Sequence, residues 1–353
     1  MMTTPPPYAA VAMQLTARDV STLGDDEVRP ATLSHIAEIG RQIANAAVFI
    51  RQYAGDPVKL AVLPEYLFTS YPGRVSIPDF ARRAAWDADG PEYAALGDIA
   101  QRFGLHLAGN AYERDPHFPD LYFQTSFLIA PSGDTVLRYR RLFSMFAPSP
   151  HDVWDAYLDA YGADAVFPVA QTEIGRLGAI ASEEILYPEI ARALAMRGAE
   201  VLLHSSSEIG SPLATTKDIA KQARGFESMA YVVSANTAGI AGTGAPLASA
   251  DGGSRIVDYR GKLMAQSLSG ETFTAFATLD IAALRKARRT PAMVNTLARQ
   301  RPGLFADVYG GAAPSFHGAN GLMGDGAAAV PDRDYFLRAQ EAVIARLEKA
   351  GII

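Results

Sequence analysis

Three short segments of the sequence carry side chains suited to acyl-transfer chemistry. Glu65 follows the apolar run KLAVLP, Arg140 and Arg141 end the run TVLRYRR, and Ser182 follows the apolar run LGAIA. Taken alone, each of these residues is explained as a polar side chain that contacts water at the end of a strand. Together, a carboxylate, a cation and a hydroxyl supply a general base, an electrostatic clamp for an oxyanion and a nucleophile. Because chemistry in open α/β sheets gathers at the carboxyl ends of strands, the sequence indicates one site built from these segments.

The elements that must position these residues alternate between strand and helix patterns. Apolar runs predict strands at 8–15, 59–63, 105–111, 177–181, 201–204, 231–236 and 273–279. Apolar residues at helical spacing predict helices at 31–53, 93–103, 187–197, 216–230 and 334–349. Turn residues predict two hairpins, which join 122–130 to 135–140 and 254–259 to 263–267. Helices mixed with hairpins favour an α/β sandwich with mixed sheets over a purely parallel, doubly wound sheet.

The length is compatible with two domains or with one large α/β domain, and we predict one domain followed by an extension. The 353 residues are 49% hydrophobic and 20% charged, which is enough apolar material for a sizeable core. We assign residues 1–290 to the domain and residues 291–353 to a C-terminal extension. The extension ends in an amphipathic helix, and we expect it to lie as an arm on the domain or on a neighbouring subunit.

Composition also excludes several kinds of protein. A net charge of -6 argues against nucleic acid or an anionic membrane surface as the main partner. The chain has no cysteine, so disulfides, thiolate metal sites and cysteine nucleophiles are absent. Its six histidines are scattered without metal-ligand spacing, and nucleotide-binding and dinucleotide motifs are missing, so we expect no metal and no organic cofactor. Without a signal sequence or an apolar run of about 18 residues, a soluble cytoplasmic protein is expected.

Six motifs in order resemble the nitrilase superfamily of carbon–nitrogen hydrolases, and the resemblance extends from about Tyr8 to Arg289. The motifs are LPEYLFTSYPG, YRR, ASEEILYPEIAR, ARGFESMAYVVSAN, GGSRIVDYRGKLM and LDIAALRKARR. The family has an αββα sandwich fold and a Glu-Lys-Cys triad, so the resemblance implies both here. The resemblance implies that Glu65 is the general base. Arg141 stands at the position where the family has Lys, and Ser182 stands where the family has Cys.

The resemblance further implies a mechanism without metal or organic cofactor. Glu65 would take the proton of the nucleophile, which attacks an amide carbonyl to form a covalent acyl-enzyme. Arg141 and the backbone N–H of Glu183 would hold the oxyanion. Glu184 stands at the acidic position of the third motif and would orient the site or form a salt bridge within the fold. Water activated by Glu65 would then release the acid.

Both departures from the family fall on the triad and leave several explanations open. A serine hydroxyl is a far weaker acid than a thiol, so hydrolysis should be slow or absent. Ser182 is then either a disabling replacement in an amidase or part of a natural non-hydrolytic relative that binds a carboxylate or amide ligand. Arg141 keeps the charge of Lys but spreads it over a planar fork, which is not a neutral exchange. Alternatively, Arg140 occupies the catalytic position.

The substrate is only coarsely indicated. EEILYPE after position 182 resembles amidases and carbamoylases, which favours an aliphatic, aryl or N-carbamoyl amide over a nitrile, although SYPG after Glu65 resembles nitrilases. Tyr66, together with Phe146 and Trp154 from an insertion-like loop at 142–162, would line an apolar pocket or pack in a subunit interface. His204 ends a buried strand and is a further candidate for substrate contact. The resemblance also implies a homo-oligomer.

Overall fold

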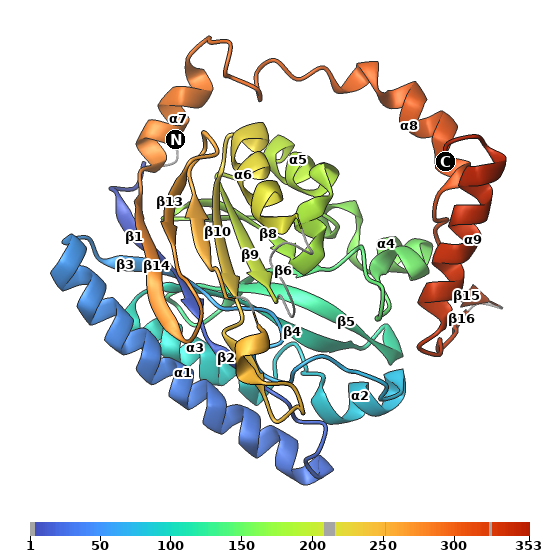
Figure 1. Ribbon diagram of the computed structural model, residues 1–353, viewed down its shortest axis with the longest axis horizontal. Coiled ribbons are helices and arrows are strands. Elements are labelled where there is room, and N and C mark those ends of the chain that lie inside the picture. Colours follow the sequence, from blue (N-terminus) through green and yellow to red (C-terminus); the bar gives the residue numbers. More distant parts are fainter. Residues whose placement is uncertain (1–3, 208–215, 251, 325–326) are drawn as a thin grey trace.

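Two six-stranded sheets lie face to face between layers of helices in the computed structural model, which describes residues 4–207, 216–250, 252–324 and 327–353 (Figure 1). The first sheet has the order β14 (Thr272–Leu279), β1 (Tyr8–Gln14), β3 (Val58–Val62), β4 (His106–Asp115), β5 (Phe118–Ile129) and β6 (Thr135–Arg140). The second has the order β13 (Leu263–Gln266), β12 (Arg255–Val257), β10 (Tyr231–Asn236), β9 (Val201–Ser206), β8 (Gly175–Ala181) and β7 (Val169–Thr172). Both sheets mix parallel and antiparallel pairs, as the sequence predicted.

Helices cover the outer face of each sheet. Those over the first sheet are α1 (Asp25–Ala54) and α3 (Pro91–Phe103), and those over the second are α5 (Pro188–Met196) and α6 (Lys217–Ser228) (Figure 1). The inner strands are mostly apolar because they are covered on both faces; every residue of β1, β9 and β10 is buried, including the polar residues near their carboxyl ends. On α1, Ile36, Ile39 and Ile43 form the buried stripe that packs on the first sheet. This arrangement confirms the predicted αββα sandwich.

Parallel pairing at the centre of each sheet brings the strand ends of the site together. In the first sheet β3 is parallel to β1 and β4, and in the second β9 is parallel to β8 and β10. Two hydrogen bonds then join the ends of β3 and β9 across the sandwich. The backbone N–H of Glu65 donates to the carbonyl oxygen of Ser206 at 3.2 Å, and the Ser205 hydroxyl donates to that of Leu63 at 2.7 Å.

The segment after β6 and the C-terminal extension form a third packed region. The segment after β6 contains the 3₁₀ helix η1 (Pro150–Val153) and α4 (Trp154–Tyr161), and the extension contains α9 (Tyr335–Lys349). Helix α2 (Ile77–Ala84) packs with them, and of these four helices only α9 was predicted. Arg333 donates hydrogen bonds to the carbonyl oxygen of Val75 and to the hydroxyl of Tyr122, and Phe336 is buried. The end of the extension therefore lies on its own chain.

The remaining elements are short or peripheral. The extension begins after α7 (Ile281–Arg289) and contains α8 (Ala306–Ala312), and this part of the chain arches over the sandwich before α9 (Figure 1). Two small sheets pair β2 (Thr16–Arg18) with β11 (Gly239–Ala241) and β15 (Met323–Gly324) with β16 (Ala327–Ala328). No helix within the described ranges is long and apolar enough to cross a membrane.

Candidate active site

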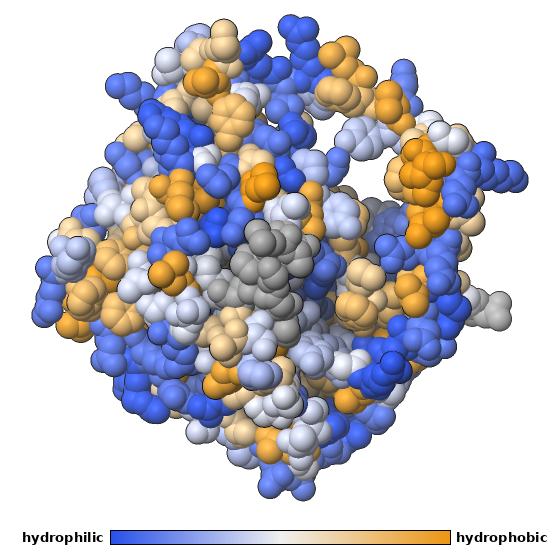
Figure 2. Space-filling view, in the orientation of Figure 1, coloured by the Kyte–Doolittle hydropathy of each residue, from blue (hydrophilic) through white to orange (hydrophobic). Residues whose placement is uncertain are grey.

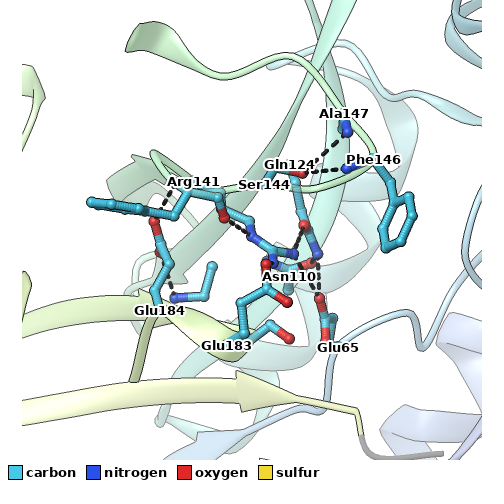
Figure 3. Close-up of polar contacts among 12 residues, drawn as sticks. Glu65, Asn110, Gln124, Arg141, Ser144, Phe146, Ala147, Glu183 and Glu184 are labelled. Carbon is cyan, nitrogen blue, oxygen red and sulfur yellow. Dashed lines mark hydrogen bonds and ion pairs between the residues drawn. The ribbon is translucent and has the colours of Figure 1, made fainter. Parts of the chain in front are cut away.

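Glu65 lies at the centre of the site, just beyond the end of β3. Its side chain is fully buried, and its Oε1 accepts a hydrogen bond from Gln124 Nε2 at 2.7 Å (Figure 3). Arg141 Nη1 lies 3.4 Å from the same oxygen. Oε2 has no hydrogen-bond partner among the described residues. Burial raises the pKa of Glu65, although Arg141, Lys217, the Ser182 hydroxyl and Gln124 each lower it. The result is a desolvated carboxyl with one oxygen available to accept a proton.

Arg141 follows β6 and holds the second position predicted from the sequence. Its Nη1 donates to Gln124 Oε1 at 2.7 Å, its Nε donates to the carbonyl oxygen of Phe143 at 2.6 Å, and its Nη2 pairs with Glu183 (Figure 3). Burial alone would lower the pKa of Arg141, but the carboxylates of Glu183 and Glu65 raise it above its ordinary value. The guanidinium is therefore a fixed cation between two carboxylates.

The neighbouring Arg140 points away from the site, which excludes it as the cation beside Glu65. It forms an ion pair with Asp115, and its guanidinium lies 4.5 Å from the ring centroid of Tyr161. Successive side chains of a strand point to opposite faces of the sheet, so only one of the two arginines can face Glu65. The structure selects Arg141.

Ser182 begins a 3₁₀ helix, η3 (Ser182–Leu186), directly after β8. Its φ of 51° lies in the left-handed region, which costs a non-glycine residue energy and is concentrated at functional sites. The side chain is buried, and its hydroxyl is among the groups that lower the pKa of Glu65, so it lies beside that carboxyl. Glu65, Arg141 and Ser182, three residues far apart in the sequence, are thus brought together.

The side chain of His204 contacts the backbone of this turn. Its Nε2 lies 2.7 Å from the carbonyl oxygen of Ser182, and its Nδ1 lies 2.8 Å from the hydroxyl of Ser234. A carbonyl only accepts, so Nε2 carries the proton and Nδ1 accepts from Ser234. Burial lowers the pKa of His204 well below its ordinary value, so the ring is neutral. The sequence suggested a substrate contact for His204; the structure corrects this, because both ring nitrogens bind protein groups and the side chain is fully buried.

Glu184 joins the turn that carries Ser182 to the segment that follows Arg141. Its Oε2 accepts from the hydroxyl of Tyr139 at 2.8 Å and from the backbone N–H of Ala181 at 3.1 Å. Its Oε1 accepts from the N–H groups of Leu142 at 2.7 Å and Phe143 at 3.0 Å. Burial raises the pKa of Glu184 to about 7, against the lowering effect of Arg141 and these donors. The carboxyl of Glu184 is therefore the clamp that sets the distance between the strand ends of Arg141 and Ser182.

The three aromatic residues that were predicted to line one apolar pocket lie at different positions in the structure. Trp154 lines a cavity beside Glu183, whereas Phe146 is 63% exposed and does not line it. Tyr66 lies close to Glu65 and Arg141, whose charges act on its pKa; burial raises that pKa, and Glu65 raises it further. Tyr66 has a φ of 62°, so the backbone on this side of the site is also in the left-handed region.

Sequence reasoning missed two groups that act on Glu65. Gln124 lies in β5 and bridges Glu65 to Arg141 and to Asn110, whose Oδ1 accepts from Gln124 Nε2 at 3.0 Å. A polar residue within the apolar run LYFQTSFLI was the available signal, since buried polar side chains are uncommon in core strands. Lys217, the first residue of α6, is buried and lowers the pKa of Glu65. Nothing in its surrounding sequence marks it.

No group of three or more His, Cys, Asp or Glu side chains within the described ranges is arranged to hold a metal ion. The chemistry available from the site residues themselves is proton transfer by Glu65, nucleophilic attack by the residue at 182, and stabilisation of a negative charge by Arg141 and backbone N–H groups.

Comparison with known proteins gives one family. Residues 28–289 match the family model of carbon–nitrogen hydrolases. The chloroplastic omega-amidase of Arabidopsis thaliana is 25% identical over 279 residues, which are 78% of this chain and 72% of that protein. A probable nitrilase of Schizosaccharomyces pombe is 23% identical over 180 residues. These are 51% of this chain and 61% of that relative, so the match spans less than two thirds of the relative's length. The crystal structure of Saccharomyces cerevisiae Nit3, a member of the nitrilase superfamily, has a TM-score of 0.62 at 20% identity and covers 82% of this chain and 97% of its own. The chain belongs to the carbon–nitrogen hydrolase family.

Proposed function

We propose that this protein cleaves carboxylic amides by acyl transfer to the side chain of residue 182, and that serine at this position keeps the rate low. The observation that carries the proposal is the arrangement of Glu65: a fully buried carboxyl with Oε2 unpartnered among the described residues, beside the Ser182 hydroxyl and a fixed cation. A buried base whose pKa is raised is a stronger proton acceptor than an exposed carboxylate.

The first half of the reaction follows from this arrangement. The Ser182 hydroxyl proton passes to Glu65 Oε2 as Oγ forms a bond to the amide carbon, and the carbonyl electron pair moves onto oxygen. Arg141 and the backbone N–H of Glu183 stabilise this oxyanion. The C–N bond then breaks, and the leaving ammonia or amine takes the proton from Glu65. An ester on Ser182 remains.

The second half uses the same groups in the same roles. Glu65 accepts a proton from water as the water oxygen bonds to the ester carbon. The oxyanion collapses, the bond from Oγ to carbon breaks, and Ser182 Oγ takes the proton back from Glu65. The products are the acid and the free hydroxyl. A serine hydroxyl is mostly un-ionised near neutral pH, so the first proton transfer limits the rate; a thiol at this position would give it up far more readily.

The names of several relatives support an amide over a nitrile. Besides the omega-amidase, the comparison includes a deaminated glutathione amidase of Yersinia enterocolitica and formamidases of Bacillus cereus. A nitrilase acting on a nitrile is the less supported reading. A non-hydrolytic relative that holds a carboxylate or amide through Arg141 is the other alternative, and it is supported by the serine at position 182, whose hydroxyl is a weak acid.

The decisive experiment compares the protein with its Ser182→Cys variant on aliphatic, aryl and N-carbamoyl amides and on matched nitriles. Ammonia or amine release and the intact mass of an acyl adduct are measured together. We expect Ser182→Cys to raise turnover by at least about a hundredfold, and Glu65→Gln added to it to remove that gain. A well-folded Ser182→Cys protein with no turnover and no adduct on any amide would overturn the proposal in favour of the non-hydrolytic alternative, whereas turnover restricted to nitriles would identify a nitrilase.

We also propose that the protein assembles as a homo-oligomer. The support is apolar surface on the arch of the extension, where Leu304, Phe305, Val308 and Tyr309 are all more than half exposed. Sedimentation or light scattering of the full chain tests this, and a strictly monomeric protein at micromolar concentration would contradict it.

A further inference from the structure

A cavity of about 510 Å³ adjoins the site on the side of Glu183, and the mechanism above does not use it. Its volume falls in the range of about 300–1,000 Å³ that is usual for small-molecule pockets. One wall is the segment directly after Arg141, including Phe143, and another is Tyr187, which follows η3. The rings of Phe143 and Tyr187 stack at 4.3 Å between centroids. The cavity therefore begins at the two segments that carry the catalytic cation and the nucleophile.

The outer walls of the cavity come from the segment after β6 and from the C-terminal extension. Trp154 contributes from the segment after β6, and Phe316, Phe336 and Val343 contribute from the C-terminal extension. Figure 2 shows hydrophobic residues gathered on the C-terminal arm at the side of the molecule. The arm is held against the domain through Arg333, which donates to the carbonyl oxygens of Val75 and Phe146. The extension thus completes a cavity of its own chain.

The charged groups around the cavity disfavour an anionic occupant. No Lys or Arg side chain from the described part of the chain lines it. Of its two carboxylates, that of Glu183 is paired with Arg141, and that of Asp152 accepts from the backbone N–H and the hydroxyl of Ser149. Burial lowers the pKa of His151, which keeps this lining side chain neutral at neutral pH. A second carboxylate on a substrate would face the carboxylate of Asp152, which already lies 3.7 Å from Nε2 of the lining residue His317.

We propose that this cavity binds the acyl part of the substrate, that this acyl part is an uncharged aryl or bulky apolar group, and that helix α9 forms its specificity-determining wall. The inference rests on the proposed amide hydrolysis. The acyl part is favoured over the amine part because it stays bonded to residue 182 through both half-reactions, and the cavity is lined by Glu183 and Tyr187 of the same segment. Aromatic walls, with both lining carboxylates already engaged by protein groups, match an apolar ring in both area and polarity.

Binding tests the inference without any need for turnover. Trp154 lines the cavity, whereas the second tryptophan of the chain, Trp86, is buried in the core, so ligand-dependent fluorescence reports on this cavity. The probes are 3-phenylpropanamide, propanamide, the anionic succinamate, and N-benzylacetamide, which carries its ring on the nitrogen. We expect the phenyl ring on the acyl side to strengthen binding by at least about tenfold over propanamide, and neither succinamate nor N-benzylacetamide to show this gain.

A matched pair of variants tests the role of α9. Ala339 lines the cavity, whereas Ala342, one turn further along the same helix, is exposed and does not line it. Ala339→Phe is expected to abolish the gain from the phenyl ring and leave propanamide unchanged, while Ala342→Phe should leave both amides unchanged. Equal effects of the two variants, equal binding of the two amides by the unaltered protein, or a preference for succinamate or N-benzylacetamide would each overturn the inference.

Turnover by the Ser182→Cys variant separates this inference from the proposed function. If propanamide is hydrolysed but the phenyl ring improves neither kcat/KM nor binding, the cavity assignment fails and amide hydrolysis stands. If 3-phenylpropanamide binds as expected but neither amide is hydrolysed, amide hydrolysis fails and the cavity remains a site for an apolar amide.

Discussion

The Nε2 of His204 lies 2.7 Å from the backbone carbonyl oxygen of Ser182, so a fully buried, neutral imidazole holds the turn that carries Ser182. The turn needs this support because Ser182 has a φ of 51°, in the left-handed region that a serine adopts only at a cost. The bond runs from within β9 to the residue directly after β8, its parallel neighbour in the second sheet. We therefore expect His204 to be a positioning residue whose effect on catalysis passes through the backbone of Ser182.

Replacing His204 should reduce the rate without changing its dependence on pH. In the Ser182→Cys background, His204→Leu removes the bond to the carbonyl oxygen of residue 182, and we expect kcat to fall by about tenfold or more with KM little changed. The acid limb of the pH profile should stay in place because His204 is already neutral. Ser234→Ala, which removes only the second contact of the imidazole, is the milder control. A shift of the acid limb in His204→Leu would show that the imidazole itself titrates in catalysis.

The dependence of activity on pH should report Glu65. Its carboxyl must be ionised to accept a proton, and burial raises its pKa, so activity should be present above this raised pKa and be lost as the pH falls through it. The acid limb of kcat/KM for the Ser182→Cys protein is thus expected above the ordinary range of a glutamate, which is about 4.3. An acid limb at or below that range would mean that Arg141 and the other groups that lower the pKa outweigh burial.

Lys217 should move this limb. The ammonium lowers the pKa of Glu65, so Lys217→Met is expected to shift the acid limb to higher pH by up to about one pH unit. Lys221→Met is the matched control, since Lys221 is also buried and lies one turn along the same helix. We expect no shift in that variant, and identical shifts in the two would indicate a general disturbance of α6.

Replacing Arg141 by lysine should lower activity. Arg141→Lys loses the planar fork that reaches Gln124, Phe143 and Glu183 at once, and a Lys ammonium cannot reproduce those directions. We expect kcat/KM of the Ser182→Cys protein to fall by at least about tenfold. Arg140→Lys serves as the control: it weakens ring contacts outside the site, so it should lower stability by about 1 kcal/mol and change kcat/KM by less than about twofold. A gain in activity from Arg141→Lys would show that Arg141 impairs catalysis.

Glu184 should matter to stability as well as to rate. In Glu184→Gln, an NH₂ group replaces one oxygen and faces two donors, so we expect a loss of about 2–4 kcal/mol in the free energy of unfolding. Tyr139→Phe removes a single donor and should cost roughly 1–2 kcal/mol. Chemical denaturation of both variants at pH 8, above the pKa of about 7, measures the difference. Equal losses in the two variants would contradict the clamp described for Glu184.

The sequence by itself determined the layered architecture and the residue types of the site. Strands β6 and β10 have the bounds that the sequence predicted, because hairpin turn residues and continuous apolar runs are local signals. Strand ends marked Glu65, Arg141 and Ser182, since parallel strands present their carboxyl ends at one edge of a sheet. The helices within 142–162 and at 77–84 were missed because their short segments carry little periodic signal.

Only the tertiary structure decided which groups act on these residues. The choice of Arg141 over Arg140 depends on the face of β6 that packs toward Glu65, which a shift of one residue in register would reverse. The roles of Gln124 and His204 depend on contacts between strands that are distant in sequence, and no local pattern encodes such contacts. The cavity depends on where the extension lies, because Phe336 and Val343 reach it only when α9 packs against a segment almost 200 residues earlier in the chain. Local patterns fix the elements, whereas burial and long-range packing fix the chemistry of each side chain.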